Sequence, residues 1–278
     1  MRVPFVKMHG LGNDFVVLDG RTEALPQVDA ALAQALADRH TGIGCDQLVL
    51  IEPSRRADLF MRIFNADGSE VEACGNATRA VGLLHGKAVR IETRGGFITA
   101  APSPGGVAVE MGEPRFDWAA IPLAFAMDTL NMPVAWGELS DPTAVNVGNP
   151  HVVFFVPDGD AVPLAELGPV IERDPLFPQR INVNVATVAD RGALRLRVWE
   201  RGAGLTRACG TGACATAIAA MRRGLVDRRV TVTLPGGALT IVWREDGEII
   251  MTGAAVESFR GSFDSADFGV ASGCKTAA

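Results

Sequence analysis

Two cysteines occupy matching positions in this sequence. Cys74 lies in Ala73-Cys74-Gly75-Asn76 and Cys209 lies in Ala208-Cys209-Gly210-Thr211, and each motif follows a strand-like run and a glycine-containing loop. A helix is expected to begin at or just after each cysteine. The positive end of a helix dipole and its unpaired backbone N–H groups lower the pKa of a thiol and can also hold a carboxylate. The pattern therefore predicts two cysteines with thiolate character, each beside an anion-binding turn.

A thiolate and a thiol that face each other suit one reaction in particular. One removes a proton from a carbon and the other returns a proton to the opposite side, which inverts the stereocentre without a cofactor. The α-proton of an amino acid is only weakly acidic, so its removal needs a desolvated base and stabilisation of the developing negative charge. The two cysteines thus indicate an amino-acid epimerase or racemase.

Other interpretations of the cysteines are weaker. A cysteine is often a small buried hydrophobe, which is what we expect for Cys45, Cys214 and Cys274. Cys209 and Cys214 have C-x4-C spacing, but no second pair of ligands follows at zinc-finger spacing, so no metal is expected. The run Gly210 to Ala215 fits a loosened dinucleotide fingerprint, but a strand does not lead directly into its first glycine.

Polar residues that could bind a ligand lie in or beside the glycine-rich turns. Arg201 could take a carboxylate through two of its guanidinium N–H groups, and His151 stands two residues after Asn149. Each has an ordinary alternative: an asparagine often caps a turn, Glu200 and Arg201 could form a surface ion pair, and a histidine is often structural. The asparagines of this group are Asn13, Asn65, Asn76, Asn149 and Asn182.

Short strands dominate the expected secondary structure. Helices are expected over Val28–Arg39, Asn76–His85 and Gly212–Arg223. Runs rich in β-branched and aromatic residues, bounded by Gly, Pro or Asp, predict strands. These runs are Phe15–Leu18, Leu48–Ile51, Leu59–Phe64, Val107–Met111, Val152–Val156, Leu194–Trp199, Val230–Leu234 and Leu239–Trp243.

The sequence also contains an internal repeat. The segments that lead from Arg62 to Cys74 and from Arg197 to Cys209 match at an offset of 135 residues, and the segments that begin at Gly12 and Gly148 match at an offset of 136. Two matches at nearly one offset predict a duplicated α/β unit. The proline-containing stretch from Pro114 to Pro133 is the expected boundary between the halves.

The composition excludes several classes of protein. The chain has 278 residues, of which 48% are hydrophobic, and its formal net charge is −6. The apolar fraction excludes a disordered chain, and the negative charge disfavours a nucleic-acid binder. No stretch reaches the roughly 20 apolar residues of a membrane span, and the N-terminal region does not resemble a signal peptide. Five scattered cysteines indicate reduced thiols and a cytoplasmic location.

The chain resembles the diaminopimelate epimerase family from about residue 5 to about residue 261. The similarity includes Leu234-Pro235-Gly236-Gly237 and Met251-Thr252-Gly253, and it departs from the family pattern at Ala77, Leu205 and Ala254. The motifs that carry it are Lys7 to Phe15, Phe64 to Glu70, Ala73 to Asn76, Gly148 to His151, Trp199 to Gly204 and Ala208 to Cys214.

The resemblance implies an α/β (α+β) fold of two pseudo-symmetric domains, each a mixed, mostly antiparallel β-sheet wrapped around a central helix, with the active site between them. We expect domains at residues 1–118 and 119–262, with the tail after about 263 returning to the first. The implied reaction interconverts LL- and meso-2,6-diaminopimelate in lysine and peptidoglycan precursor biosynthesis, without pyridoxal phosphate or metal. The expected partners are the substrate and a second copy of the chain, as a homodimer, with no nucleic acid and no membrane.

The resemblance also implies roles for individual residues. Cys74 is the expected proton donor and Cys209 the proton acceptor for the LL substrate, while His151 and Glu200 tune the pKa of the cysteines. The substrate-binding set is Asn13, Gln47, Asn65, Gly75, Asn76, Asn149, Asn182, Glu200, Arg201, Gly210 and Thr211. Two alternatives stay open: a related racemase or isomerase for another amino acid, and a non-catalytic metabolite-binding relative, which the presence of both cysteines disfavours.

Overall fold

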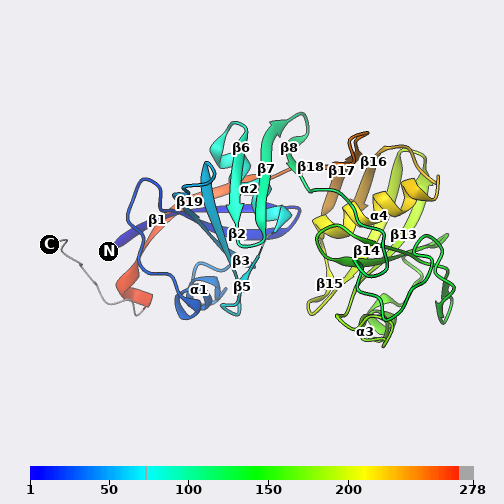
Figure 1. Ribbon diagram of the computed structural model, residues 1–278. Helices are drawn as coiled ribbons and strands as arrows, with labels where there is room; N and C mark the ends of the chain where they lie inside the picture. Colours follow the sequence, from blue (N-terminus) through cyan, green and yellow to red (C-terminus); the bar gives the residue numbers. More distant parts are fainter. Residues whose placement is uncertain (73, 269–278) are drawn as a thin grey trace. The chain divides into compact units, whose positions relative to one another are not determined.

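The computed structural model describes residues 1–72 and 74–268, so the expectation for Cys274 lies outside the described residues. The chain divides into two compact units (Figure 1). Unit 1 contains Met1–Val107 and the segment from Ala254 onward, and unit 2 contains Ala108–Gly253. Unit 2 is therefore inserted into unit 1.

These limits differ from the domain limits expected from the sequence, 118 and 262. Residues 108–118 belong with unit 2 because Met111 donates a backbone hydrogen bond to Ile249, and Arg115 exchanges two backbone hydrogen bonds with Asn146. The return to unit 1 is earlier because strand β19 (Val256–Asp264) pairs antiparallel with β1 (Arg2–Gly10) along nearly its whole length.

The sheet of unit 1 is mixed and mostly antiparallel. Strand β1 lies between β19 and β2, and the order continues through β3 and β4. The pairs β2–β3 and β4–β6 are parallel, whereas β4–β5 and β6–β7 are antiparallel. The remaining strands of this part of the chain are β2 (Asn13–Asp19), β3 (Gln47–Glu52), β4 (Leu59–Asn65), β5 (Glu70–Val71), β6 (Val89–Thr93), β7 (Gly96–Ser103) and β8 (Gly106–Glu110).

The sheet of unit 2 repeats this series of pairings. The pairs β12–β13 and β14–β16 are parallel, and β11–β12, β13–β14, β14–β15, β16–β17 and β17–β18 are antiparallel. Two further strands, β9 (Ala135–Trp136) and β10 (Leu139–Ser140), form a separate pair. The strands are β11 (Thr143–Asn146), β12 (Pro150–Phe155), β13 (Asn182–Asp190), β14 (Ala193–Glu200), β15 (Gly204–Thr206), β16 (Arg229–Leu234), β17 (Gly237–Trp243) and β18 (Ile249–Gly253).

The matching series confirms the duplicated unit. Strands β1–β7 of unit 1 correspond in order and direction to β11–β17 of unit 2, apart from the small pair β9–β10. The correspondence places Gln47 opposite Phe15 in one register and Asn182 opposite His151 in the other. The two offsets of the repeat therefore relate residues at equivalent positions of the two units.

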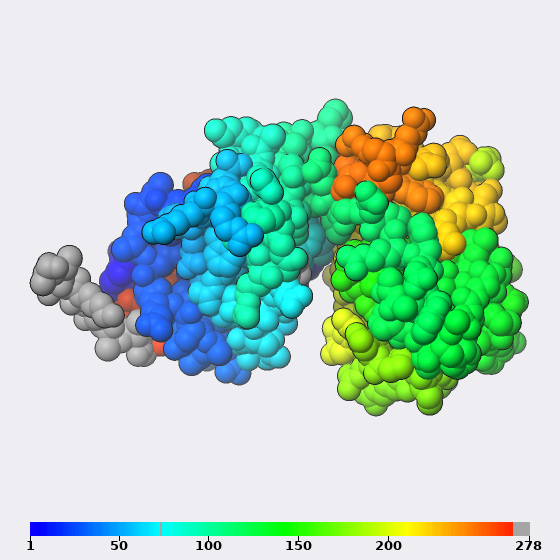
Figure 2. All heavy atoms as spheres, in the orientation of Figure 1, coloured from blue at the N-terminus to red at the C-terminus, as the bar shows by residue number. Residues whose placement is uncertain are grey.

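Each unit wraps its sheet around one helix. Helix α2 (Gly75–His85) contacts β1, β6, β7 and β19, and α4 (Gly210–Arg222) contacts strands β11–β14 and β16–β18. Ten residues of α4 are buried, and five of them are alanines, whose small side chains allow close packing on every face. In Figure 2, green segments that precede α4 in the chain cover most of the visible face of unit 2.

A second helix packs outside each sheet. Helix α1 (Ala30–Ala37) belongs to a core cluster of unit 1 that includes Leu32, Leu36 and Phe263, and α3 (Leu164–Glu172) belongs to one of unit 2. The sequence did not predict α3, which follows Pro163 and contains Pro169. Pro163 is the N-cap residue and so lies outside the helix interior, where proline is disfavoured. The packing of α3 in its core cluster overrides the helix-breaking tendency of Pro169.

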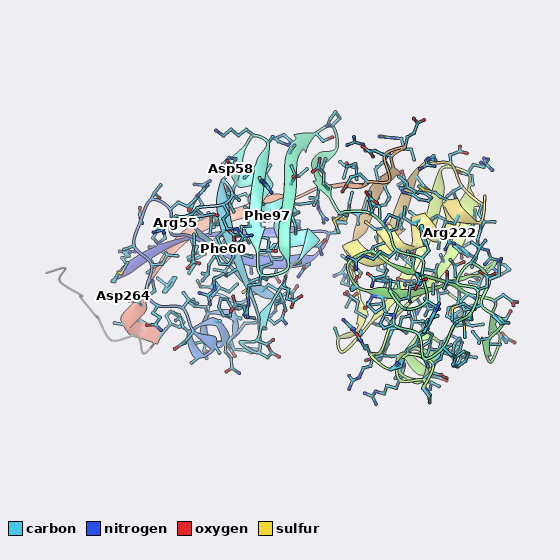
Figure 3. The ribbon with its side chains drawn as sticks, in the orientation of Figure 1. Arg55, Asp58, Phe60, Phe97, Arg222 and Asp264 are labelled. Carbon is cyan, nitrogen blue, oxygen red and sulfur yellow. The ribbon has the colours of Figure 1, made fainter. Side chains whose placement is uncertain are left out.

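All the predicted strands and the other three helices are present, with ends that differ by a few residues. The strands that the sequence missed are β1, β5, β6, β7, β9, β10, β11, β13, β15, β18 and β19. Strand β19 closes unit 1 at Asp264 (Figure 3), whose carboxylate accepts a hydrogen bond of 2.7 Å from the N-terminal ammonium of Met1.

Candidate active site

Cys74 in unit 1 directly precedes the central helix. It is the N-cap residue of α2, with φ −149° and ψ 117°, and it is half-buried. The N–H groups of Gly75 and Asn76 belong to the first turn, where an α-helix supplies no acceptor of its own. The thiol therefore stands beside a turn whose backbone can bind an anion.

A chain of hydrogen bonds orients two of the expected substrate-binding asparagines. The fully buried guanidinium of Arg79 donates to Oδ1 of Asn76 at 2.8 Å, and Nδ2 of Asn76 donates to Oδ1 of Asn13 at 3.1 Å. Nδ2 of Asn13 donates in turn to Asp46 at 3.1 Å. Arginine can only donate and a carboxylate can only accept, so the two ends of the chain determine which way both amides point.

Gln47 and Asn65 lie opposite each other on β3 and β4. Nε2 of Gln47 donates to Oδ1 of Asn65 at 3.0 Å, and Nδ2 of Asn65 donates to Ser69 at 3.1 Å. Oε1 of Gln47 is buried and has no hydrogen-bond partner among the described residues. A buried acceptor without a partner is costly, and a bound ammonium or hydroxyl donor would satisfy it.

A charged cluster that the sequence did not single out supports this part of unit 1. The carboxylate of Asp14 accepts from Lys7 at 2.5 Å and from Arg39 at 2.6 Å, and Arg39 also pairs with Asp46. Burial would raise the pKa of Asp14, but the hydrogen bonds from Arg39 and Lys7 outweigh it and hold the pKa well below its ordinary value. Lys7 and Asp14 belong to the same sequence motif as Asn13, and this shared motif could have indicated that they lie near the site.

Cys209 in unit 2 is the N-cap residue of α4 and is 4% exposed. Its Sγ accepts a hydrogen bond from the backbone of Gly212 at 3.3 Å and lies 3.6 Å from Oγ1 of Thr211. Position 212 has little room for a side chain, since a Cβ there would lie 2.9 Å from Oδ1 of Asn184 and 3.2 Å from this sulfur. Gly210 and Thr211 form the first turn, as Gly75 and Asn76 do in unit 1.

The expectation that Cys209 has a lowered pKa, and so thiolate character, is wrong. Burial, followed by the negative charge of Glu200, raises the pKa well above its ordinary value. The hydrogen bonds from Thr211 and Gly212 act in the opposite direction but are outweighed. Glu200 itself is held by a hydrogen bond of 2.5 Å from Thr206.

His151 is fully buried and lies between two asparagines. Nε2 is 2.9 Å from Oδ1 of Asn149, and Nδ1 is 3.1 Å from Nδ2 of Asn184. Burial lowers the pKa of His151 to about 3, so the ring is neutral near pH 7. Asn184 was not predicted as a site residue.

Asn182 and the loop that precedes it hold Arg201. Oδ1 of Asn182 accepts from the backbone N–H of Arg201 at 3.0 Å, and its Nδ2 donates to Pro150 at 2.8 Å. The Arg201 guanidinium is exposed and donates to the backbone carbonyl of Gln179 at 2.9 Å. A second residue that the sequence missed, buried Glu172 of α3, accepts from Trp199 at 2.7 Å and from Gly202 at 3.1 Å.

The expected site residues occupy equivalent positions in the two units. Asn13, Gln47, Asn65, Cys74 and Asn76 of unit 1 correspond to Asn149, Asn182, Glu200, Cys209 and Thr211 of unit 2 through the offsets of the repeat. Within each unit they gather at one end of the sheet and at the start of the central helix. Among residues 1–72 and 74–268, no group of three or more His, Cys, Asp or Glu side chains is arranged to hold a metal ion. The same ranges contain no helix long and apolar enough to span a membrane.

The sequence is similar to known proteins over nearly its whole length. The family model described as diaminopimelate epimerase matches residues 5–117 and 143–257. The chain is 70% identical over 268 residues to the diaminopimelate epimerase of Erythrobacter litoralis, which covers 96% of this chain and 100% of that protein. It is 66% identical to the diaminopimelate epimerase of Rhizorhabdus wittichii, over 97% of this chain and 98% of that protein.

Solved structures share the fold at low sequence identity. A phenazine biosynthesis protein of the PhzF family from Enterococcus faecalis has a TM-score of 0.69 at 15% identity and covers 95% of this chain and 100% of its own. A probable proline racemase from Agrobacterium radiobacter has a TM-score of 0.62 at 16% identity, over 94% of this chain and 93% of its own. Together with the two helix-capping cysteines, the family match and the high identities show that the chain belongs to the diaminopimelate epimerase family.

Proposed function

We propose that this protein interconverts LL- and meso-2,6-diaminopimelate, with Cys74 and Cys209 as the two proton carriers. The observation that carries the proposal is the repeated placement of a cysteine at the N-cap of the central helix in both units of a member of this family. Cys209 accepts the α-proton of the LL substrate and Cys74 donates a proton to the opposite face. In the reverse direction the two thiols exchange roles.

The first turns of the central helices stabilise the reaction. The N–H groups of Gly75 and Asn76, and of Gly210 and Thr211, hold the carboxylate next to the reacting carbon. Negative charge moves onto this carboxylate when the α-proton leaves. Preoriented backbone donors stabilise that charge in the transition state without reorganisation.

The raised pKa of Cys209 gives Glu200 a defined part in this scheme. With the site free of substrate, burial and the Glu200 carboxylate keep Cys209 in the thiol form. The ammonium group of the substrate, when it pairs with Glu200, compensates that negative charge and so favours the thiolate. The thiolate of Cys209, which is the base, therefore forms when the substrate is bound. His151 is neutral and contributes through its hydrogen bonds rather than through a positive charge.

Diaminopimelate has a second amino-acid group far from the reacting carbon. Asn13, Gln47, Asn65, Asn149, Asn182 and Arg201 are proposed to bind the two ends of the substrate. A guanidinium can take a carboxylate through two parallel hydrogen bonds. Binding energy from the distal end helps to position and desolvate the reacting end. The chemistry requires no cofactor, and we place the enzyme in the cytoplasm, as a homodimer, in lysine and peptidoglycan precursor biosynthesis.

The test follows α-proton exchange by NMR, with purified protein and LL-diaminopimelate in D2O. The wild type should form meso product that carries deuterium at the inverted carbon. Cys74→Ala and Cys209→Ala should each reduce epimerisation by about a thousandfold or more, since each face of the carbon then lacks its proton carrier. Cys214→Ala, in the second turn of α4, is the matched control and should stay within a few-fold of wild type.

Two results would contradict the proposal. A Cys209→Ala protein with near wild-type turnover would exclude the two-thiol reaction. Racemisation of lysine at a rate similar to that of diaminopimelate would exclude the substrate, because lysine lacks the distal carboxylate, and would favour a racemase for another amino acid.

A further inference from the structure

A polar pair is buried inside unit 2 between strands β12 and β13. His151 and Asn184 are both 0% exposed. Nδ2 of Asn184 donates to Nδ1 of His151 at 3.1 Å and to the backbone carbonyl of Val152 at 3.0 Å. Burial of two polar side chains is unfavourable unless their hydrogen bonds are made, and Oδ1 of Asn184 accepts none within the described part of the chain.

The fold itself does not need this polar pair. The equivalent positions of unit 1, found through the same offsets and the same parallel strand pair, hold Phe15 and Val49, which are both 0% exposed. The two units have the same strand order around their central helices, so an apolar pair is sufficient for the scaffold. The polar pair of unit 2 therefore requires a reason other than folding.

The directions of the hydrogen bonds supply that reason. A backbone carbonyl can only accept, so Val152 fixes the amide of Asn184 with its NH2 group toward Val152 and His151. Nδ1 of the neutral His151 ring must then accept, which leaves the proton on Nε2. Nε2 donates to Oδ1 of Asn149, whose NH2 group remains for another partner.

We propose that Asn184 is a positioning residue that sets the protonated nitrogen of His151 and, through it, directs the NH2 group of Asn149 toward a carboxylate oxygen of the substrate. The last step rests on the proposed function, which places Asn149 among the substrate-binding residues. The equivalent asparagine of unit 1 is Asn13, and its Oδ1 likewise accepts a hydrogen bond, in this case from Nδ2 of Asn76. In both units the amide oxygen accepts a hydrogen bond from inside the unit, although Nδ2 of Asn13 also donates one hydrogen bond to Asp46.

The first test is independent of any substrate. Protein labelled with 15N at histidine is examined by NMR, and the His151 signals are assigned by their loss in His151→Phe. Wild-type His151 should show a protonated Nε2 and a hydrogen-bonded, unprotonated Nδ1. Protonation at Nδ1 would overturn the proposal whatever the variants do.

The second test is a double-mutant cycle with Asn184→Val and His151→Phe. Both substitutions introduce the residue that unit 1 has at the equivalent position, so the double variant reproduces an apolar pair that this scaffold is known to accommodate. With otherwise wild-type protein, Asn184→Val should raise KM for diaminopimelate by about tenfold or more, with a smaller change in kcat. In the His151→Phe background the same substitution should change KM by less than about twofold, because Asn184 acts through His151.

Thr216→Val is the control. Thr216 lies on α4, is 0% exposed, and its hydroxyl has no hydrogen-bond partner among the described residues, so its loss should leave kcat and KM within about twofold. An additive cycle, or an unchanged KM in Asn184→Val, would overturn the positioning role. If Asn184→Val does not fold, the comparison of the double variant with His151→Phe and the NMR measurement on the wild type still test the proposal. If the wild type does not act on diaminopimelate, the proposed function fails while the NMR result still tests the hydrogen-bond directions.

Discussion

At the scale of single residues, burial has more influence on the ionisation of Cys209 than the hydrogen bonds at the start of its helix have. An N-terminal helix position favours a thiolate by an interaction that is limited to the first turn and easily screened. Removal of the thiolate from water, with the carboxylate of Glu200 nearby, acts more strongly and in the opposite direction. The same desolvation keeps His151 neutral.

Substitution of Glu200 by glutamine should lower the pH at which Cys209 ionises. The amide keeps the shape of the side chain but removes the negative charge that raises the pKa of the thiol. Thiolate absorbance near 240 nm gives the titration curve, because the chain contains no tyrosine that would absorb as it ionises in the same range.

The Cys209 signal is isolated by subtraction of the spectrum of a Cys209→Ala partner in each background. This subtraction removes Cys45, whose pKa burial raises to about 11. An unchanged or higher titration midpoint in Glu200→Gln would show that the carboxylate does not control the thiol.

At the scale of elements, helix α3 positions the strand end that carries Glu200 and Arg201. Gly168 of α3 packs directly on the indole of Trp199, where a Cβ would lie 2.5 Å from two ring carbons. The indole also donates to Glu172 at the end of α3. The helix thus contacts β14 at the residue that precedes the proposed site.

Gly168→Ala should destabilise the protein although it raises helix propensity. Alanine inside a helix is favoured over glycine by about 1 kcal/mol, but the clash with Trp199 should cost about 1–3 kcal/mol. We expect a lower free energy of unfolding, a shifted indole fluorescence and a higher KM, since Trp199 must move.

Ala165→Gly is the matched control, because Ala165 is exposed on the same helix. It should lose about 1 kcal/mol through propensity alone and leave the fluorescence and KM unchanged. A Gly168→Ala protein that is more stable than the wild type would show that α3 and Trp199 are not in close contact.

At the scale of the whole molecule, the chain leaves unit 1 and later returns to it. Strand β19 completes the sheet of unit 1 by pairing with β1, and Gly261 lies against Phe5. A Cβ at position 261 would be 2.6 Å from the ring of Phe5. The stability of unit 1 therefore depends on a segment that follows all of unit 2 in the sequence.

Gly261→Ala should loosen unit 1 selectively. We expect faster hydrogen exchange in β1 and β19, with β16 and β17 of unit 2 unchanged, because the clash of about 1–3 kcal/mol falls at the strand pair that closes unit 1. Gly192→Ala, where the nearest atom lies at 3.4 Å, is the control in unit 2. Equal acceleration in both units would contradict a local effect.

The sequence by itself determined the features that depend on short-range patterns. Residue type and alternation predicted three helices and eight strands, and the offsets of 135 and 136 residues predicted the duplication and the paired positions of Cys74 and Cys209. The family's motifs identified the candidate site residues for the same reason, since each motif is a continuous run that can be compared directly.

Only the tertiary structure decided the features that depend on burial and on contacts between distant segments. The raised pKa of Cys209 and the neutral ring of His151 arise from burial in the folded unit. The contributions of Glu172 and Asn184 arise from partners 27 and 33 residues away in the chain. The domain limits likewise follow from β19 pairing with β1. Desolvation and hydrogen-bond direction are properties of the packed environment, and no local pattern in the sequence reports how deeply a side chain will be buried.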